Sequence, residues 1–360
     1  MDIATAKKQV IEAGHKLIEC GLIARTWGNI SCRISDTQFV ITPSGRSYEN
    51  LTPEDIVTVN IADCAYEGSI KPSSEKGIHA DCYRLRPDVG FVIHTHQTNA
   101  SVLSVLNMDV LVNDVDAVAL MGAKIPCAAY GLPGTKKLRH GVSAALLANP
   151  DSKAVIMAHH GALCAGKDFD EAFRISAMLE KICEDKLTGA DNIAAYRYDG
   201  IVGTSERTEN GFSLLTSGND AEGNARETQI HKAIYDARPD VQYILHDTDP
   251  YALHCSGGQK PLKPLLDDFA QLVGINLKIA KDCDNDIAKK SKGRNAVLVK
   301  GRGAYCFAST ESDAKAVEMI LNKGCKTQFE ASLLGKPKVI GIVDSLLMRI
   351  IYLKKYSKKI

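Results

Sequence analysis

Residues 75–96 read EKGIHADCYRLRPDVGFVIHTH, and this stretch decides how the rest of the chain is interpreted. Its first part, together with the two serines that precede it, is typical of a helix that begins near Ser73 or Ser74 and stops before Pro87. Its second part, GFVIHTH, is an apolar run of strand length that ends in histidines. The stretch therefore predicts a helix that leads into a buried strand with polar side chains at its end.

A second copy of this pattern lies further along the chain. Residues 227–241, ETQIHKAIYDARPDV, match residues 75–89 at eight of fifteen positions, whereas average composition predicts about one match. In the same order, KAVIMAHHGALCAGKDFDEA pairs with NAVLVKGRGAYCFASTESDA, and FxxxxSG occurs at Phe39–Gly45 and Phe212–Gly218. The second copy has shorter loops, and we expect it to lack the first helix and the first strand.

Two copies are too few for a solenoid, so the repeat indicates duplication of one domain. A chain of 360 residues is long enough for two domains, each with its own core. We expect domains at residues 1–205 and 206–360, with the join near residues 188–208. Helix-like and strand-like segments are interleaved, which places both domains in the α/β or α+β class.

Composition excludes several classes of protein. Lys and Arg number 44 against 43 Asp and Glu, so the chain lacks the basic excess typical of nucleic-acid binding. It contains no run of about 18 apolar residues that would span a membrane, and MDIATAKKQVIEAG lacks the apolar stretch of a signal peptide. The 11 cysteines form no CxxC pair, which favours reduced thiols in the cytoplasm.

Histidines end two apolar strands. His94 and His96 are two residues apart, so on a strand both imidazoles point to one face and can meet at a metal ion. The alternative is a polar pair on a solvated face. KAVIMAHH ends in His159 and His160, whose side chains would point to opposite faces, so only one of them can join the pair. Strand geometry does not choose between them, and an ordinary loop is the alternative. Together they predict a three-histidine catalytic metal site.

Small polar residues near the start of the predicted helix are candidates for a phosphate site, because a helix N-terminus favours anions. Simple N-capping by serine is the alternative, and no Walker or dinucleotide pattern is present. The candidates lie in three turns, and they are Gly28, Asn29, Ser44, Gly45, Ser73 and Ser74.

Glu75 follows the serine pair. It is a candidate acid/base if it faces the metal, and the alternative is a carboxylate favoured only by the helix dipole. The second copy bears on this choice, because it replaces His96 by Thr248, His160 by Arg302, and Ser73-Ser74 by Ala225-Arg226. The joint loss indicates that the metal and phosphate residues form one site. Glu75 survives as Glu227, which favours a structural role.

The motifs TWGNIS, ITPSG, PSSE, HTH and AHHG occur in this order over about residues 5–190. In this the chain resembles the class II aldolase/adducin family, which contains L-fuculose-1-phosphate aldolase and L-ribulose-5-phosphate 4-epimerase. The resemblance implies a three-layer α/β/α fold with a mixed, largely antiparallel central sheet, here duplicated. It also implies homo-oligomers, a dimer or a tetramer, with sites between subunits.

The resemblance assigns roles to the candidate residues. It implies that one zinc ion per chain binds His94, His96 and His160, and that the phosphate of the substrate binds the six turn residues named above. The family has Glu after the serine pair in its aldolases and Asp in its epimerase, so Glu75 favours an aldolase. Val115 and Pro133 stand where the fuculose-phosphate aldolase has aromatic residues in its aldehyde pocket.

The sequence therefore predicts a zinc-dependent aldolase that cleaves a phosphorylated ketose to dihydroxyacetone phosphate and an aldehyde, with Glu75 as the catalytic residue. A sugar-phosphate 4-epimerase or dehydratase is the alternative within the family, and a product assay separates them. An adducin-like, non-catalytic interaction protein is an alternative that suits only the second copy. We expect that copy to bind no metal, and we expect neither nucleic-acid nor membrane partners.

Overall fold

The computed structural model describes residues 1–23 and 27–355 and divides into two compact units that meet between Leu187 and Thr188. This division falls at the start of the segment where the sequence predicts the join. Thr26 of the TWGNIS motif and the last five residues of the basic tail lie outside the described residues. All 11 cysteines are free thiols, and no helix in the described ranges is long and apolar enough to cross a bilayer.

The first unit is built on a seven-stranded sheet in the order β3-β2-β1-β4-β9-β8-β7. Its neighbouring strands are antiparallel except β7 and β8, which are parallel. In chain order, the elements of this unit are α1 (Ile3–Glu19), β1 (Asn29–Arg33), β2 (Gln38–Ile41), the 3-10 helix η1 (Tyr48–Asn50), β3 (Val57–Asn60), α2 (Lys76–Leu85), β4 (Phe91–Thr95), α3 (Thr98–Ser104), β5 (Val110–Leu111), α4 (Val115–Met121), β6 (Lys124–Ile125), β7 (Cys127–Ala128), α5 (Lys136–Ala148), β8 (Ala154–Met157), β9 (Gly161–Gly166) and α6 (Phe169–Asp185).

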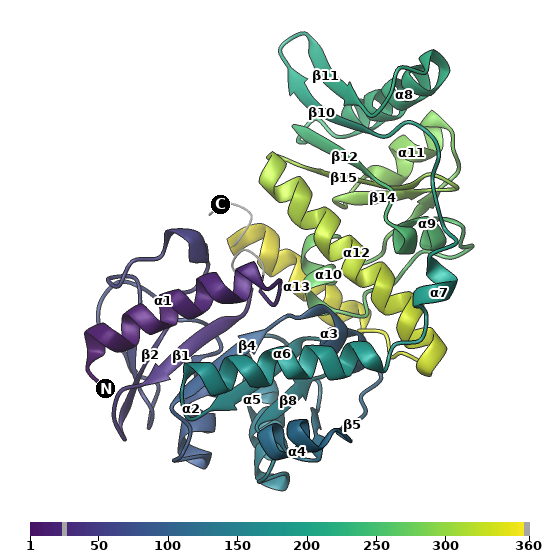
Figure 1. Ribbon diagram of the computed structural model, residues 1–360. Helices are drawn as coiled ribbons and strands as arrows, with labels where there is room; N and C mark the ends of the chain where they lie inside the picture. The colour runs from purple at the N-terminus through teal and green to yellow at the C-terminus, as the bar shows by residue number, and fades with distance from the viewer. Residues whose placement is uncertain (24–26, 356–360) are drawn as a thin grey trace. The chain divides into compact units, whose positions relative to one another are not determined.

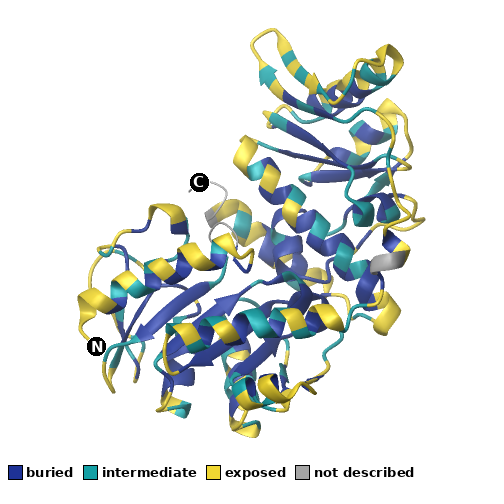
Figure 2. Ribbon diagram, in the orientation of Figure 1, coloured by how far each residue is buried: buried dark blue, intermediate teal, exposed yellow. Residues whose placement is uncertain are grey.

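Helices cover both faces of this sheet, because its central strands are apolar on both sides (Figure 1). On β4, Phe91 and Ile93 pack with α1 and α6, whereas Val92 between them packs with α2 and α5. Figure 2 shows the result, with the strands buried and the outer faces of the helices exposed. The first unit is thus a three-layer α/β/α structure, as the resemblance implied.

The second unit repeats the arrangement. Its six-stranded sheet has the order β11-β10-β12-β15-β14-β13, which corresponds to β2-β1-β4-β9-β8-β7, and again only the last pair is parallel. In chain order, its elements are α7 (Ala190–Ile193), β10 (Gly203–Thr208), β11 (Gly211–Thr216), α8 (Ala221–Ala237), β12 (Tyr243–Asp247), α9 (Pro250–Ser256), α10 (Asp267–Leu272), β13 (Ile279–Ala280), α11 (Asp284–Ser291), β14 (Ala296–Val299), β15 (Gly303–Ala308), α12 (Glu311–Leu334) and α13 (Ile342–Lys355).

The duplicated, mixed and largely antiparallel fold is therefore confirmed, with one correction. The second unit lacks counterparts of α1 and β3, but it keeps the first strand as β10, so the expected loss of that strand was wrong. The reason is composition, since β10 reads GTSERT and buries only Gly203 and Ser205. A strand this polar has no apolar alternation by which sequence patterns recognise it.

Candidate metal centre and active site

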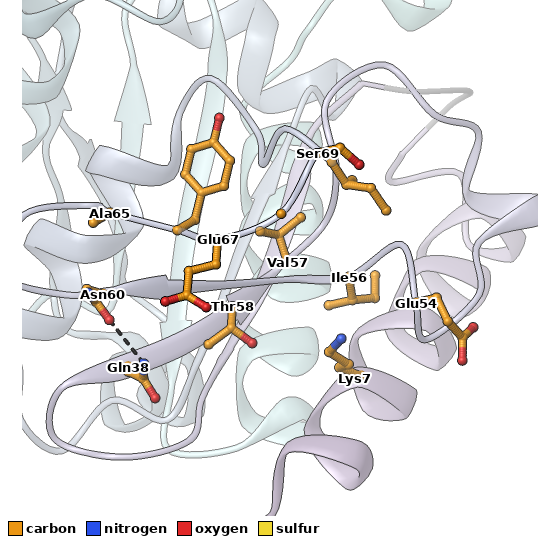
Figure 3. Close-up of a pocket in the computed structure, with 13 residues that line it drawn as sticks. Lys7, Gln38, Glu54, Ile56, Val57, Thr58, Asn60, Ala65, Glu67 and Ser69 are labelled. Carbon is orange, nitrogen blue, oxygen red and sulfur yellow. Dashed lines mark hydrogen bonds between the residues drawn. The ribbon is translucent and has the colours of Figure 1, made fainter.

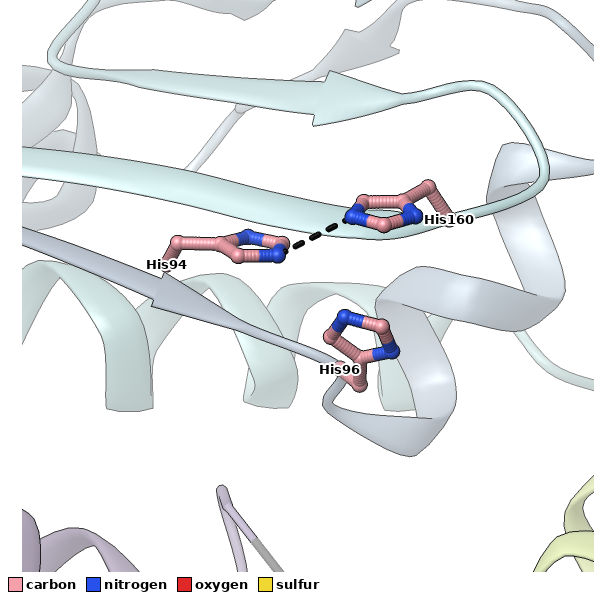
Figure 4. A group of neighbouring side chains, drawn as sticks. All are labelled: His94, His96 and His160. Carbon is pink, nitrogen blue, oxygen red and sulfur yellow. Dashed lines mark hydrogen bonds between the residues drawn. The ribbon is translucent and has the colours of Figure 1, made fainter. Parts of the chain in front are cut away.

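Two neighbouring strands bring three histidines together (Figure 4). His94 lies in β4, His96 follows its last residue, and His160 lies in the turn between β8 and β9. Strand β9 pairs with β4, which places this turn beside the end of β4. One ring nitrogen from each histidine lies within 4.8 Å of the others, and the Nε2 atoms of His94 and His160 are 3.1 Å apart.

This donor set fits a zinc ion. Tetrahedral zinc with Zn–N bonds of about 2.0–2.1 Å separates its ligand nitrogens by roughly 3.3 Å, close to the 3.1 Å between His94 and His160. His94 Nδ1 donates to the carbonyl of Ala162 at 2.9 Å. This hydrogen bond fixes the tautomer and leaves the Nε2 lone pair of His94 directed at the other histidines, as in metal-binding imidazoles.

His159 points elsewhere, which the sequence pattern could not decide. Strand β8 ends at Met157, and His160 N donates to Met157 O at 3.0 Å to close a turn. His159 has a φ of 65° in this turn, and its ring packs edge-on against Tyr130 with centroids 5.2 Å apart. The alternation rule for strands therefore does not apply here, because both histidines lie beyond the strand.

Glu75 lies beside the histidine cluster, just before the first residue of α2. Its Oε2 lies 3.2 Å from His94 Nε2 and its Oε1 lies 3.2 Å from His160 Nε2. Asn29 Nδ2 donates to Oε2 at 3.1 Å. Glu75 is itself the N-cap residue of α2, which begins at Lys76, two residues after Ser74 of the predicted start near Ser73 or Ser74.

The environment of Glu75 favours the charged form. Burial of this side chain, which is only 7% exposed, would raise its pKa, but His160, His94 and His96 outweigh burial and hold the pKa well below its usual range. A buried carboxylate beside three imidazoles is the charge arrangement that suits a bound dication. The same carboxylate is placed to exchange a proton with a ligand at that ion.

Asn29 is the first residue of β1, and the other five phosphate candidates lie on the loops before β1, after β2 and before α2. Ser44 N donates to Lys71 O at 2.9 Å and Ser73 N donates to Thr42 O at 3.0 Å, which joins two of the three turns. Gly28 has a φ of 82°, and a Cβ there would collide with the carbonyl oxygen of His94, so this residue ties the third turn to β4. Asn29 points its amide at Glu75, and Ser74 is exposed beside α2.

A cavity elsewhere in the first unit contains none of these residues. It has a volume of about 620 Å³ and lies along β2, β3 and the loop that follows β3 (Figure 3). Its wall is polar and carries Lys7, Glu54 and Glu67, and Gln38 Nε2 donates to Asn60 Oδ1 across its floor at 3.0 Å. It belongs to the edge of the sheet and not to the histidine centre.

A comparison with protein families identifies the family of the chain. The family described as "Class II Aldolase and Adducin N-terminal domain" matches residues 8–187 and again residues 201–329. The chain belongs to the class II aldolase and adducin family. Both units match the same description, so the duplication is one of a class II aldolase domain.

Curated relatives carry aldolase names. A 5-deoxy-D-ribulose 1-phosphate aldolase from Bacillus thuringiensis is 33% identical over 175 residues, which are 48% of this chain and 80% of that protein. The L-fuculose phosphate aldolase of Escherichia coli K12 is 33% identical over 50% of this chain and 82% of its own length. A solved L-fuculose 1-phosphate aldolase covers 50% of this chain and 84% of its own, with 31% identity and a TM-score of 0.47.

In the second aldolase-like unit, Glu227, the counterpart of Glu75, is surrounded by side chains that hydrogen-bond to it. Glu227 accepts hydrogen bonds from His231 Nε2 at 3.1 Å, His246 Nδ1 at 2.9 Å and the Tyr305 hydroxyl at 2.8 Å. The other ring nitrogen of His246, Nε2, lies 2.8 Å from the carbonyl oxygen of Arg302. A protein oxygen therefore faces each nitrogen of His246, and neither nitrogen is open to a metal.

The guanidinium of Arg302, the residue that replaces His160 in the second copy, is held by other groups. Its Nε donates to Asp282 at 2.6 Å and its Nη1 donates to the Tyr198 hydroxyl at 2.7 Å. Sequence reasoning missed Tyr305, although its signal was present in the repeat, where GAYC of the second copy pairs with GALC of the first. The hydroxyl that this exchange adds is one of the three donors on Glu227.

Proposed function

We propose that the first unit is a zinc-dependent class II aldolase that cleaves a phosphorylated ketose to dihydroxyacetone phosphate and an aldehyde. The carrying observation is the buried Glu75 carboxylate, which lies 3.2 Å from two of three convergent imidazoles. In this proposal His94, His96 and His160 hold one zinc ion per chain. When bound, the ion supplies a Lewis acid that polarises the carbonyl of the ketose.

The residues of the chain perform the proton transfers. When the carbon–carbon bond breaks, the hydroxyl of the departing half gives its proton to Glu75 and becomes the carbonyl of the aldehyde. The electron pair of the broken bond stays with the dihydroxyacetone phosphate half. Glu75, having taken up a proton, delivers it to the carbon that keeps this pair, and in the direction of synthesis it removes the same proton. Its position beside the histidines supports this role.

The phosphate of the ketose binds, in this proposal, to Gly28, Asn29, Ser44, Gly45, Ser73 and Ser74. Support comes from the hydrogen bonds that join their turns and from the N-terminus of α2, which favours an anion. Binding energy from a group that does not react can thereby position the carbon atoms that do react.

The second unit, residues 206–360, has a supporting role in this proposal and holds no metal. The chain as a whole would act as a cytoplasmic homo-oligomer, a dimer or a tetramer. Exposed apolar side chains in each unit support association, since Val115 of α4 in the first unit is 80% exposed and Ile342 and Val343 of α13 in the second are 73% and 74% exposed.

The test is a product assay on the zinc-loaded full chain. Candidate substrates are L-fuculose 1-phosphate and 5-deoxyribulose 1-phosphate, and dihydroxyacetone phosphate is detected through its reduction by NADH with glycerol-3-phosphate dehydrogenase. We expect one dihydroxyacetone phosphate and one aldehyde per ketose consumed. Sugar conversion without release of dihydroxyacetone phosphate would identify an epimerase or a dehydratase and overturn the aldolase assignment.

A further inference from the structure

A buried chain of hydrogen bonds connects Glu75 to residues that the proposed reaction does not use. Asn29 Nδ2 donates to Glu75, and His79 Nε2 lies 2.6 Å from Asn29 Oδ1. On the other side of the ring, His79 Nδ1 lies 2.6 Å from Ser31 Oγ, which lies 2.7 Å from the Tyr83 hydroxyl. All five side chains are buried.

The chemistry of these groups sets one direction for the whole chain. The carbonyl oxygen of Asn29 only accepts, so His79 carries its hydrogen on Nε2 and accepts on Nδ1 from the hydroxyl of Ser31. The oxygen of Ser31 then accepts from Tyr83. Burial holds the pKa of His79 down at about 3, so its ring stays neutral and keeps this single tautomer. Each donor thus orients the next group towards Glu75.

The second unit contains the same chain without Asn29. Ser205 Oγ lies 2.6 Å from His231 Nδ1 and 2.9 Å from the Tyr235 hydroxyl, which repeats the first unit closely. Ser31 lies opposite Val92 in its sheet and Ser205 opposite Ile244, so the residue two places earlier, Asn29, corresponds to Gly203. The two hydrogen-bond chains therefore differ at one position, where the first unit has Asn29 and the second unit has Gly203.

That difference changes what the glutamate contacts. Because Gly203 has no side chain, Glu227 lies close to its backbone. A Cβ added to Gly203 would lie 2.9 Å from the Cγ of Glu227. His231 then donates to Glu227 directly at 3.1 Å. In the first unit the amide of Asn29 stands between His79 and the carboxylate. Glu75 instead places one oxygen on His94 and the other on His160.

We propose that His79 is a positioning residue, which holds the amide of Asn29 in the one orientation that keeps Glu75 directed at the reacting carbon. This inference rests on the proposed aldolase function and adds to it one residue, His79, and a second task for Asn29 besides phosphate binding. Without the donor on His79 the amide is free to turn over, and its oxygen then repels the carboxylate. One hydrogen of the Asn29 amide remains for a ligand.

The experiment isolates the proton transfer from carbon–carbon cleavage. Zinc-loaded full chain is incubated with dihydroxyacetone phosphate in D₂O, and exchange of its carbon-bound hydrogen is followed by NMR. We expect His79→Phe to lower the rate constant for exchange tenfold or more, with the KM for dihydroxyacetone phosphate and the zinc content within twofold of the unsubstituted protein. His231→Phe is the matched control, since it removes the corresponding buried ring of the second unit, and it should leave exchange unchanged.

A second variant covers the case in which His79→Phe does not fold. Asn29→Gly recreates the arrangement of the second unit, where glycine is accommodated at this place, and we expect it to fold and to lose exchange to a similar extent. Exchange that stays at the rate of the unsubstituted protein in both variants would overturn the proposal. For His79→Phe, a loss of exchange that follows the zinc content or the KM would also overturn it, because such a loss indicates a structural role.

The outcome for the unsubstituted protein separates this inference from the function on which it rests. If that protein neither exchanges the hydrogen of dihydroxyacetone phosphate nor cleaves any ketose 1-phosphate, the proposed function fails. If it does both and His79→Phe matches it, only the positioning role fails.

Discussion

The two units carry a glutamate at equivalent positions, Glu75 and Glu227. We expect replacement of each by glutamine to have a different consequence. Glu227 accepts from His231, His246 and Tyr305 and makes no contact that serves a reaction. Glu75 accepts from Asn29 and lies beside His94 and His160 of the candidate metal site. Glu227→Gln should therefore weaken the fold, and Glu75→Gln should stop turnover.

The magnitude for Glu227 follows from its pKa. Burial would raise this pKa, but the hydrogen bonds from His231 and His246 outweigh burial and lower it from 4.5 to about 2. At about 1.4 kcal/mol per pKa unit, the ionised carboxylate stabilises the folded second unit by about 3 kcal/mol. A pKa that folding depresses stabilises above the unfolded value, so this contribution is complete above about pH 5 and disappears as the pH falls towards 2.

The assay is urea unfolding of the full chain, followed by pulsed hydrogen exchange and mass spectrometry of peptides from α8 and β12. Near pH 7 we expect Glu227→Gln to lower the free energy of unfolding of these elements by about 3 kcal/mol. The difference between the two proteins should shrink at pH 3, because the glutamine does not titrate. A difference that stays constant with pH would refute the reasoning, since the stabilisation would then not come from the charge.

Glu75→Gln provides the other half of the comparison. We expect turnover to fall about 100-fold or more, the scale of a lost acid/base group, while zinc content and the exchange protection of α2 stay unchanged. Glutamine can still accept from Asn29, so the local structure keeps that hydrogen bond. If Glu75→Gln instead weakened α2 as strongly as Glu227→Gln weakens α8, and turnover persisted, both glutamates would be structural.

Other predictions concern the metal and its support. His96→Ala should remove most zinc and activity, measured by elemental analysis and the product assay, and full zinc occupancy in this variant would contradict the ligand assignment. The unsubstituted chain should hold one zinc ion, and a second ion that persists in His96→Ala would show that the second unit binds metal. Gly28→Ala should lower the free energy of unfolding by more than about 1 kcal/mol, because its Cβ meets the carbonyl of His94 at a φ of 82°. An unchanged thermal midpoint together with unchanged zinc affinity would contradict that.

The sequence predicted the fold class and the histidine cluster because both depend on short patterns. His94 and His96 follow from two-residue spacing on a strand, and the repeat follows from identities that survive in both copies. The choice of His160 over His159 came from resemblance, and its physical reason is a turn with positive φ beyond the end of β8. Second-copy Gly301 takes a φ of 76° at the equivalent place, where a side chain is not needed.

The hydrogen-bond chain behind Glu75 could not be predicted, because it depends on contacts between residues far apart in sequence. His79 and Tyr83 recur in the second copy as His231 and Tyr235, but this recurrence does not show which residues the side chains contact. Asn29 was grouped with phosphate candidates on its turn alone, whereas its amide joins His79 to Glu75. Identity at single positions does not reveal that Gly203 in the second unit breaks this connection.

The closed site of the second unit has a consequence for how the chain can change. The three donors on Glu227 all depend on this one carboxylate, since its loss would leave a hydroxyl and two imidazole nitrogens without their acceptor in a buried place. A three-histidine site like that of the first unit would need changes at Thr248 and Arg302 as well as at Tyr305 and Gly203. A single replacement of Glu227 therefore lowers stability without creating a set of metal ligands. The hydrogen bonds that Glu227 accepts are enough to retain this glutamate without a role in a reaction.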